Sequence, residues 1–235
     1  MRVQGGLQPE DWRRWGQFTT VKSNAAELLR RELRASQRIY CSPLVDPYQP
    51  AEAEARIMPG ILEALCETPP LVFTLQTRGP LVLRDLELIT RLAGKTRVRV
   101  SFSITTNPDE VRKLYEPLCA PIAERLNVVR ALREAGIEAY VTLAPLLPCD
   151  PEELARLAIE ASARDLIGDP LHTRVAKPRG ATTREAAVYI SETRGFEKWH
   201  DPVYQAAVGE RIRETAEASG VCFETGPLGF ARLAR

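Results

Sequence analysis

The stretch around which we interpret the chain is Arg38-Ile39-Tyr40-Cys41-Ser42-Pro43-Leu44-Val45-Asp46-Pro47-Tyr48-Gln49-Pro50-Ala51-Glu52. It begins as a short apolar run with β-branched and aromatic residues, then passes through a proline-rich polar segment into a helical pattern. This order predicts a strand, a polar loop and a helix. In parallel α/β proteins the loops at the carboxyl ends of strands converge over the ligand site. A proline-stiffened connection without a ligand is the alternative interpretation.

The same kind of unit recurs along the chain. We expect helical patterns between the strands, the first capped by Asn24 and Glu27, a later one closed by Gly136 and another started by Asp150. The expected strands lie at residues 39–45, 71–75, 98–104, 140–143 and 166–167. Strands that alternate with helices in this way predict a parallel βα repeat, either an open sheet or a barrel.

Three regions follow from this pattern. Residues 1–20 form a polar lead-in with tryptophans, residues 21–175 carry the repeat, and residues 176–235 form a helical or αβ extension. The extension contains a long polar helical pattern that ends at Gly220 and is followed by the apolar run 221–223. Periodicity alone leaves two alternatives for it, a last αβ unit or a cap over the loops.

Composition limits the function classes. Of 235 residues, 44% are hydrophobic and 27% are charged, with no apolar run of the ~20 residues that a membrane span needs. The first residues lack the apolar centre of a secretory signal, so we expect a soluble, cytoplasmic protein without membrane contact. Its net charge of +1 supplies no general attraction to nucleic acid and does not exclude it. Oligomeric state leaves no trace in the sequence.

The five cysteines are separated by 25 to 73 residues, and no pair has the spacing of a metal-binding clip. His172 and His200 are the only histidines. We therefore expect free thiols in a reducing compartment and no protein-only metal site.

Several motifs in order carry a family resemblance. They are residues 21–29 (VKSNAAELL), 46–52 (DPYQPAE), 76–78 (QTR) with 81–85 (LVLRD), 101–106 (SFSITT), 116–117 (EP), 125–126 (RL) and 144–148 (APLLP). Together they resemble the radical SAM proteins of the spore photoproduct lyase-like group. The resemblance is collinear and runs from about Trp15 to Asp169.

The resemblance implies a partial (β/α)6 TIM-like barrel that lacks its first strand. It also implies S-adenosylmethionine and a [4Fe-4S] cluster as cofactors. In that family the cluster is bound by a C-x3-C-x2-C motif, which this sequence does not contain. Two explanations stand, a chain that starts after the cluster loop and a relative that has lost the chemistry. We favour the first, because residues 15–18 (WGQF) resemble the usual continuation of that loop.

The resemblance also suggests roles for single residues. Asp46 with Gln49 would supply the acceptor and donors for the methionyl amino and carboxylate groups. Arg78 would neutralise that carboxylate, although the family often has Lys at this position. Ser101 and Ser103 would bind the ribose. Glu116 and Arg125 are interpreted as a structural ion pair between helices. The remaining expected cofactor contacts, which line the pocket, are Tyr48 and Pro145.

Two functions from different classes follow. The first is a radical SAM enzyme of the lyase-like type, which cleaves S-adenosylmethionine reductively to a 5′-deoxyadenosyl radical and acts on an unknown substrate. By the resemblance that substrate could be nucleic acid, although the charge gives no support. As it stands, without the cluster motif, the chain would be inactive. The second is a cluster-free remnant or nucleoside-binding domain. No catalytic residue and no metal ligand can be named.

Overall fold

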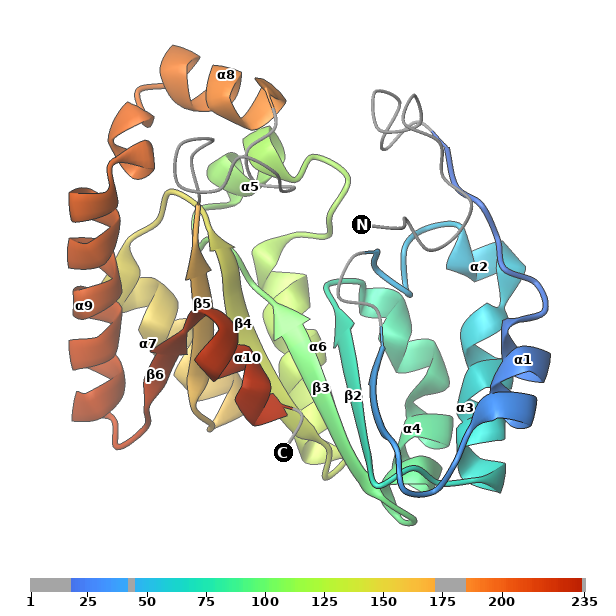
Figure 1. Cartoon of the computed structure of the whole chain (residues 1–235). Helices are drawn as coiled ribbons and strands as arrows, with labels where there is room; N and C mark the ends of the chain where they lie inside the picture. Colours follow the sequence, from blue (N-terminus) through green and yellow to red (C-terminus); the bar gives the residue numbers. More distant parts are fainter. Residues whose placement is uncertain (1–17, 42–44, 172–184, 234–235) are drawn as a thin grey trace.

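The computed structural model describes residues 18–41, 45–171 and 185–233. It contains a six-stranded sheet in which every neighbouring pair is parallel and the strands follow chain order (Figure 1). The strands are β1 (Arg38–Cys41), β2 (Val72–Thr77), β3 (Arg97–Ser103), β4 (Glu138–Leu146), β5 (Leu166–Pro170) and β6 (Phe223–Thr225). All carboxyl ends therefore lie at one edge, which is the upper edge in Figure 1.

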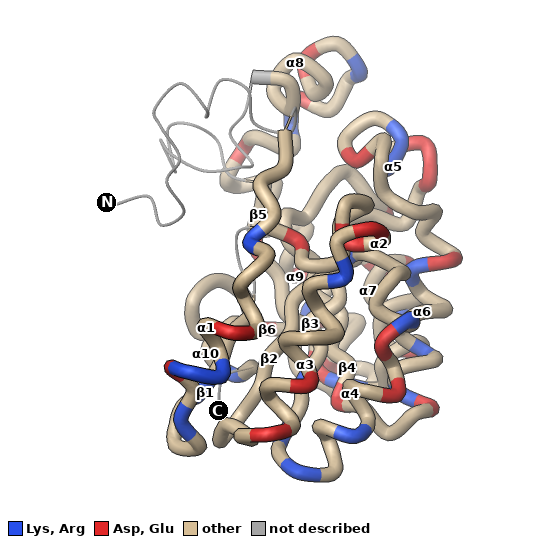
Figure 2. The backbone as a smooth tube through the Cα atoms, turned by 90° about the vertical axis from the view of Figure 1, so that its right-hand side faces the viewer, with Lys and Arg blue, Asp and Glu red and all other residues tan. Residues whose placement is uncertain are grey.

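Helices lie between consecutive strands, before the first strand and after the last one. In chain order they are α1 (Ala25–Glu32), α2 (Glu52–Ala55), α3 (Ile57–Glu67), the 3-10 helix η2 (Pro80–Asp85), α4 (Leu86–Ala93), α5 (Asp109–Tyr115), α6 (Ile122–Glu134), α7 (Pro151–Ser162), α8 (Glu185–Thr193), the 3-10 helix η4 (Glu197–His200), α9 (Pro202–Ala218) and α10 (Gly226–Leu233). Figures 1 and 2 show α10 on the opposite face from α3, α4, α6 and α7. The result is a curved sheet with helices outside and one helix inside, the arrangement of a partial TIM-like barrel.

Side-chain alternation explains the two faces of β3. Val98, Val100 and Phe102 are buried in the core that the outer helices cover. Arg99, Ser101 and Ser103 take the other face because successive side chains of a strand point to opposite sides. Arg99 contacts α10, so this second face is the inner one.

The structure confirms the predicted parallel order and corrects several element ends. β2 continues through Thr77 and β4 through Leu146, so residues expected in loops belong to strands. The first strand stops at Cys41, and Val45 lies outside it. Asn24 occupies the N-cap position of α1 but its side chain makes no capping bond. The caps at Asp150 and Gly136 are as expected.

The C-terminal region supplies the last αβ unit. α9 packs on α7, and β6 pairs in parallel with β5, which decides between the two alternatives left open for this region. α10 then turns back along the inner face. Of the lead-in expected at residues 1–20, residues 1–17 lie outside the described part of the chain.

Candidate cofactor-binding site at the carboxyl ends of the strands

Asp46 joins the loops that follow β1 and β2. Its Oδ1 accepts hydrogen bonds from the Tyr48 amide at 2.9 Å and the Thr77 hydroxyl at 2.6 Å. Its Oδ2 accepts one from the Arg78 amide at 2.8 Å. A carboxylate has about four acceptor positions. Asp46 is half-buried, so it fixes the two loops while Oδ2 keeps capacity for another donor.

Arg78 continues from this point into a buried ion-pair cluster. Its guanidinium contacts Glu116 Oε1, and Arg125 Nη1 donates to Glu116 Oε2 at 2.7 Å. The side chains of Glu116 and Arg125 are 7% and 0% exposed, whereas that of Arg78 is 32% exposed. Arg78 is therefore the member of this trio that reaches solvent.

The charges within the cluster stabilise one another. Burial is the largest single influence on the pKa of Arg78 and acts to lower it, but Glu116, Cys119 and Asp46 together outweigh burial, so the pKa lies above its ordinary value. Burial acts to raise the pKa of Glu116, but Arg78 and Arg125 outweigh that effect and hold the pKa below its ordinary value. Arg78 and Glu116 are thus both charged at neutral pH.

Two further groups fix the buried end of the cluster. The Thr105 hydroxyl donates to Glu116 Oε2 at 2.9 Å, and Arg125 Nη2 donates to the Ser103 carbonyl at the end of β3. Arg125 Nε is buried without a hydrogen-bond partner among the described residues. The Glu116–Arg125 ion pair was expected from the sequence, and the structure adds Arg78 to it.

The two candidate serines lie on the inner face. Ser101 Oγ is 2.5 Å from the Thr142 hydroxyl on β4, and both side chains are fully buried. On the neighbouring strands the Tyr40 hydroxyl donates to Gln76 Oε1 at 2.9 Å. Burial raises the pKa of Tyr40 to about 12, so its phenol stays neutral. Next to the charged mouth, the inner face of β1 to β4 therefore carries neutral hydroxyl and amide groups, whereas the charged Arg99 of this face lies nearer the amino end of β3.

The other candidates are placed as follows. Tyr48 is buried, and its hydroxyl donates to Asp85 Oδ2 at 3.0 Å in η2. Gln49 is half-buried in the loop before α2. Pro145 lies near the end of β4 after a cis peptide bond. The structure thus groups Asp46 and Arg78 with each other, places the serines along β3, and turns the Tyr48 hydroxyl away to Asp85.

Sequence reasoning did not single out Thr77 and Thr105. Both are buried threonines directly at or after a strand end, and both donate to a carboxylate of this site. Their position after an apolar run was a usable signal, because that is where loop side chains converge. Their acceptors could be named only once the strand order was known.

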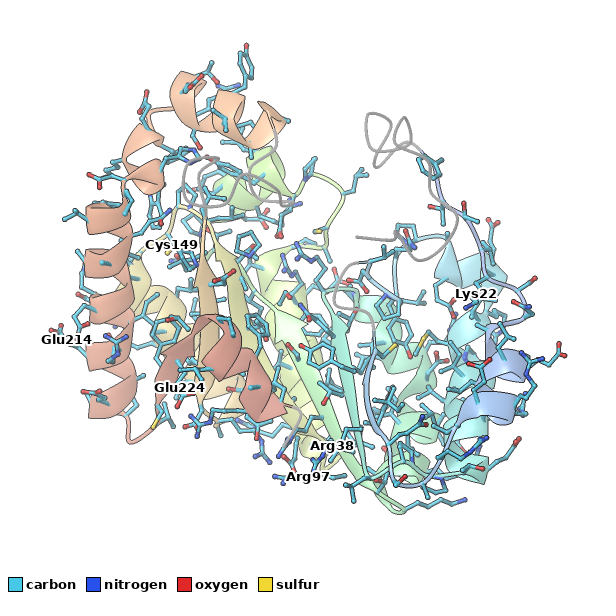
Figure 3. The ribbon with its side chains drawn as sticks, viewed as in Figure 1. Lys22, Arg38, Arg97, Cys149, Glu214 and Glu224 are labelled. Atoms are coloured by element: carbon cyan, nitrogen blue, oxygen red, sulfur yellow. The ribbon has the colours of Figure 1, made fainter. Side chains whose placement is uncertain are left out.

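The cysteines do not assemble into a metal site. All five are free, and within the described ranges no three His, Cys, Asp or Glu side chains gather closely enough to hold a metal ion. Figure 3 shows Cys149 beyond β4, and burial raises its pKa to about 12. The residues present here therefore do not fit an iron–sulfur cluster.

No family model matches the chain. Its fold does resemble that of radical SAM enzymes. It superposes on spore photoproduct lyase bound to a dinucleoside spore photoproduct with a TM-score of 0.55 at 16% identity, over 87% of this chain and 66% of that one. It superposes on S-adenosylmethionine-bound SuiB of Streptococcus suis with a TM-score of 0.51 at 12% identity. This match covers 77% of this chain and 36% of SuiB. Identities this low show the fold alone.

Relatives by sequence are uncharacterized proteins. One from Mycobacterium tuberculosis is 36% identical over 133 residues, which are 54% of this chain and 38% of the relative. One from Methanocaldococcus jannaschii is 27% identical over 57% of this chain and 50% of its own length. One from Acidianus two-tailed virus is 26% identical over 69% of this chain and 56% of its own length. The matches thus span about half of these proteins or less.

Figure 2 shows Lys and Arg positions interspersed with Asp and Glu positions along the backbone of α1, α4 and α6. None of the helices in the described residues is both long and apolar enough to cross a membrane.

Proposed function

We propose that this chain binds S-adenosylmethionine through its amino-acid head at the carboxyl ends of β1 and β2, as the cofactor-binding part of a radical SAM enzyme. The observation that carries the proposal is the junction of Asp46 and Arg78, whose amide lies 2.8 Å from Asp46 Oδ2. The charge of Asp46 also helps to raise the pKa of the Arg78 guanidinium, and a carboxylate and a guanidinium in one site complement the ammonium and carboxylate of an α-amino acid. The neutral hydroxyl and amide groups next to them suit an uncharged adenosine.

Charge balance supports a zwitterion over a simple anion. The site contains two carboxylates, Asp46 and Glu116, and two guanidinium groups, Arg78 and Arg125. Their charges sum to zero, so binding a net anion would leave unbalanced charge in a partly buried place. The amino-acid head of S-adenosylmethionine adds one charge of each sign, and its sulfonium adds one positive charge outside that pair. The likeness to solved structures whose descriptions include S-adenosylmethionine agrees with this ligand.

In radical SAM enzymes a [4Fe-4S] cluster supplies the electron that cleaves the bound cofactor. The residues of this chain do not fit such a cluster, so the roles proposed for them are binding and orientation. Arg78 would take the methionyl carboxylate, Asp46 the ammonium group, and the inner face would exclude water from the adenosyl group.

The second candidate is a cluster-free nucleoside-binding domain of the same fold. The neutral hydroxyl and amide groups of Tyr40, Gln76, Ser101 and Thr142 favour it, because they suit an uncharged nucleoside. The two functions differ in what the amino-acid head contributes. A nucleoside-binding domain would bind 5′-methylthioadenosine, which lacks that head, as tightly as S-adenosylmethionine.

Isothermal titration calorimetry of the full chain with both compounds tests the proposal. We expect S-adenosylmethionine to bind more tightly, and Arg78→Ala to weaken it by about 1.5–3 kcal/mol, the range for hydrogen bonds to charged groups. Asp46→Asn should weaken it by a similar amount. Arg130→Ala is the control, because Arg130 is 31% exposed and also pairs with one glutamate, Glu160, but lies on α6 away from the mouth. Equal affinity for both compounds would reject this function in favour of the second.

A further inference from the structure

Glu116 connects the solvent-facing Arg78 to the fully buried interior. Its two oxygens are used differently, because Oε1 contacts Arg78 while Oε2 accepts from Arg125 and Thr105. Arg125 and Thr105 are both 0% exposed and are held by the ends of α6 and β3. With Oε2 fixed at two points, the direction of Oε1 is fixed as well.

This arrangement determines where the guanidinium of Arg78 lies. Arginine side chains have several rotatable bonds, and an exposed one samples many positions. The guanidinium has five donors in a planar fork, so it can contact Glu116 and still present donors to a second acceptor. Asp46 already fixes the backbone of Arg78 through its amide. Both ends of the Arg78 side chain are therefore held before any ligand arrives.

We infer that Glu116 is a positioning residue, which holds the Arg78 guanidinium in the orientation that receives a ligand carboxylate, and that Thr105 and Arg125 act through Glu116. This inference rests on the proposed function and adds three residues to it. It assigns to the Glu116–Arg125 ion pair a role in ligand selection besides its part in joining α6 to the end of β3. The gain for binding is preorganisation, since less side-chain freedom is lost when the ligand binds.

Thr105 offers a mild test because its replacement leaves every charge in place. Thr105→Val removes the hydroxyl that donates to Glu116 at 2.9 Å. The adjacent Thr106 gives a matched control, since it is also 0% exposed and donates its hydroxyl to a carbonyl, that of Pro148, at 2.5 Å. Thr106→Val also removes one buried threonine hydroxyl, but this hydroxyl makes no contact with the ion-pair cluster.

The readout is the ratio of affinities for S-adenosylmethionine and 5′-methylthioadenosine, measured by calorimetry on the full chain. For Thr105→Val we expect about a three- to fivefold loss for the first compound and no change for the second, as for one weakened hydrogen bond to a charged group. Thr106→Val should change neither. Glu116→Gln should cost about tenfold for S-adenosylmethionine, and in an Arg78→Ala background it should have no further effect.

The outcomes separate the two levels of the argument. Wild-type affinities that do not differ between the compounds reject the proposed function, and this inference with it. A wild-type difference that survives unchanged in Thr105→Val and Glu116→Gln overturns the inference alone. A purely structural role would lower the melting temperature and leave the ratio unchanged. If Glu116→Gln fails to fold because Arg125 is left unpaired, the affinity ratio of Thr105→Val compared with that of Thr106→Val still tests the inference.

Discussion

At the scale of single residues, Glu116 has the most unusual surroundings among the groups at the mouth. It is a carboxylate with 7% exposure between two guanidinium groups, and they hold its pKa below the ordinary 4.5. A carboxyl group whose pKa is lower in the folded state than in the unfolded state stabilises the fold above the unfolded pKa. That stabilisation is lost as the pH falls below about 4.5 toward the folded value.

We therefore expect the free energy of unfolding to fall steeply between about pH 5 and pH 3. Urea unfolding at a series of pH values measures this dependence. In Glu116→Gln the dependence should be shallower, because that position no longer takes up a proton on unfolding. The control is Glu67→Gln, which removes a carboxylate paired with Arg30 on the surface, where solvent screens the charges. Identical slopes in the two variants would contradict the assignment.

Tyr48 gives a second prediction at this scale. Its ring is buried, and its hydroxyl donates to Asp85, which is also bound by Arg84. Tyr48→Phe removes that hydrogen bond and keeps the ring, so we expect a loss of about 1–2 kcal/mol in the free energy of unfolding. The affinity for S-adenosylmethionine should remain unchanged. A variant with wild-type stability and weakened binding would instead place the hydroxyl at the ligand.

Whether the role of a site residue could be predicted from the sequence depended on how far away its hydrogen-bond partner lies in the chain. Asp46 and Arg78 were named from the sequence because charged groups directly after strands point to a ligand site. The position of Thr77 and Thr105 after apolar runs was a usable signal, but their carboxylate partners could be named only once the strand order was known. The threonines acquire a role only through carboxylates 31 and 11 residues away in the chain.

At the scale of elements, α10 is likewise an element that could not be predicted from its own sequence. Its sequence, GPLGFARL, begins with helix-breaking residues and has no long apolar period. Its position follows from tertiary contacts, since Arg99 Nη1 donates to the carbonyls of Arg232 and Leu233 at 2.9 Å each. The Thr74 hydroxyl donates to the Leu233 carbonyl at 2.6 Å. Two inward-facing strand residues thus satisfy the carbonyls that every helix leaves free at its C-terminus.

Replacing Arg99 tests this contact. Arg99→Met should lower the free energy of unfolding by about 2–4 kcal/mol, since it leaves buried carbonyl groups without donors. Amide hydrogen exchange in α10 should become faster than in β3. Arg97→Met is a close control, because Arg97 lies on the same strand and pairs with the same Glu138 but is 49% exposed. Equal losses in the two variants would show that α10 does not depend on Arg99.

At the scale of the whole molecule, the repeat of apolar runs was enough to predict parallel strands in chain order, whereas the partial barrel was expected from the family resemblance. Each β-strand is covered by helices on its outer face, so the alternation of strand and helix patterns shows in the sequence. The strand ends were less certain because inner-face positions such as Gln76 and Thr77 are polar, and polar residues resemble loops. When the interior of a barrel is lined with hydroxyl groups, the ends of its strands are therefore difficult to predict from the sequence.

The final prediction concerns the cluster. A [4Fe-4S] cluster needs several thiolates on one short loop, with one iron left open for the cofactor. In this chain Cys66 is buried, burial raises the pKa of Cys41 to about 12, and no cysteine pair shares a loop. Anaerobic reconstitution of residues 1–235 with iron and sulfide should therefore give no stoichiometric cluster absorbance, with spore photoproduct lyase treated in parallel as the positive control. Full occupancy would show that the thiols can rearrange, whereas substoichiometric iron that a five-fold Cys→Ser variant also takes up would be adventitious.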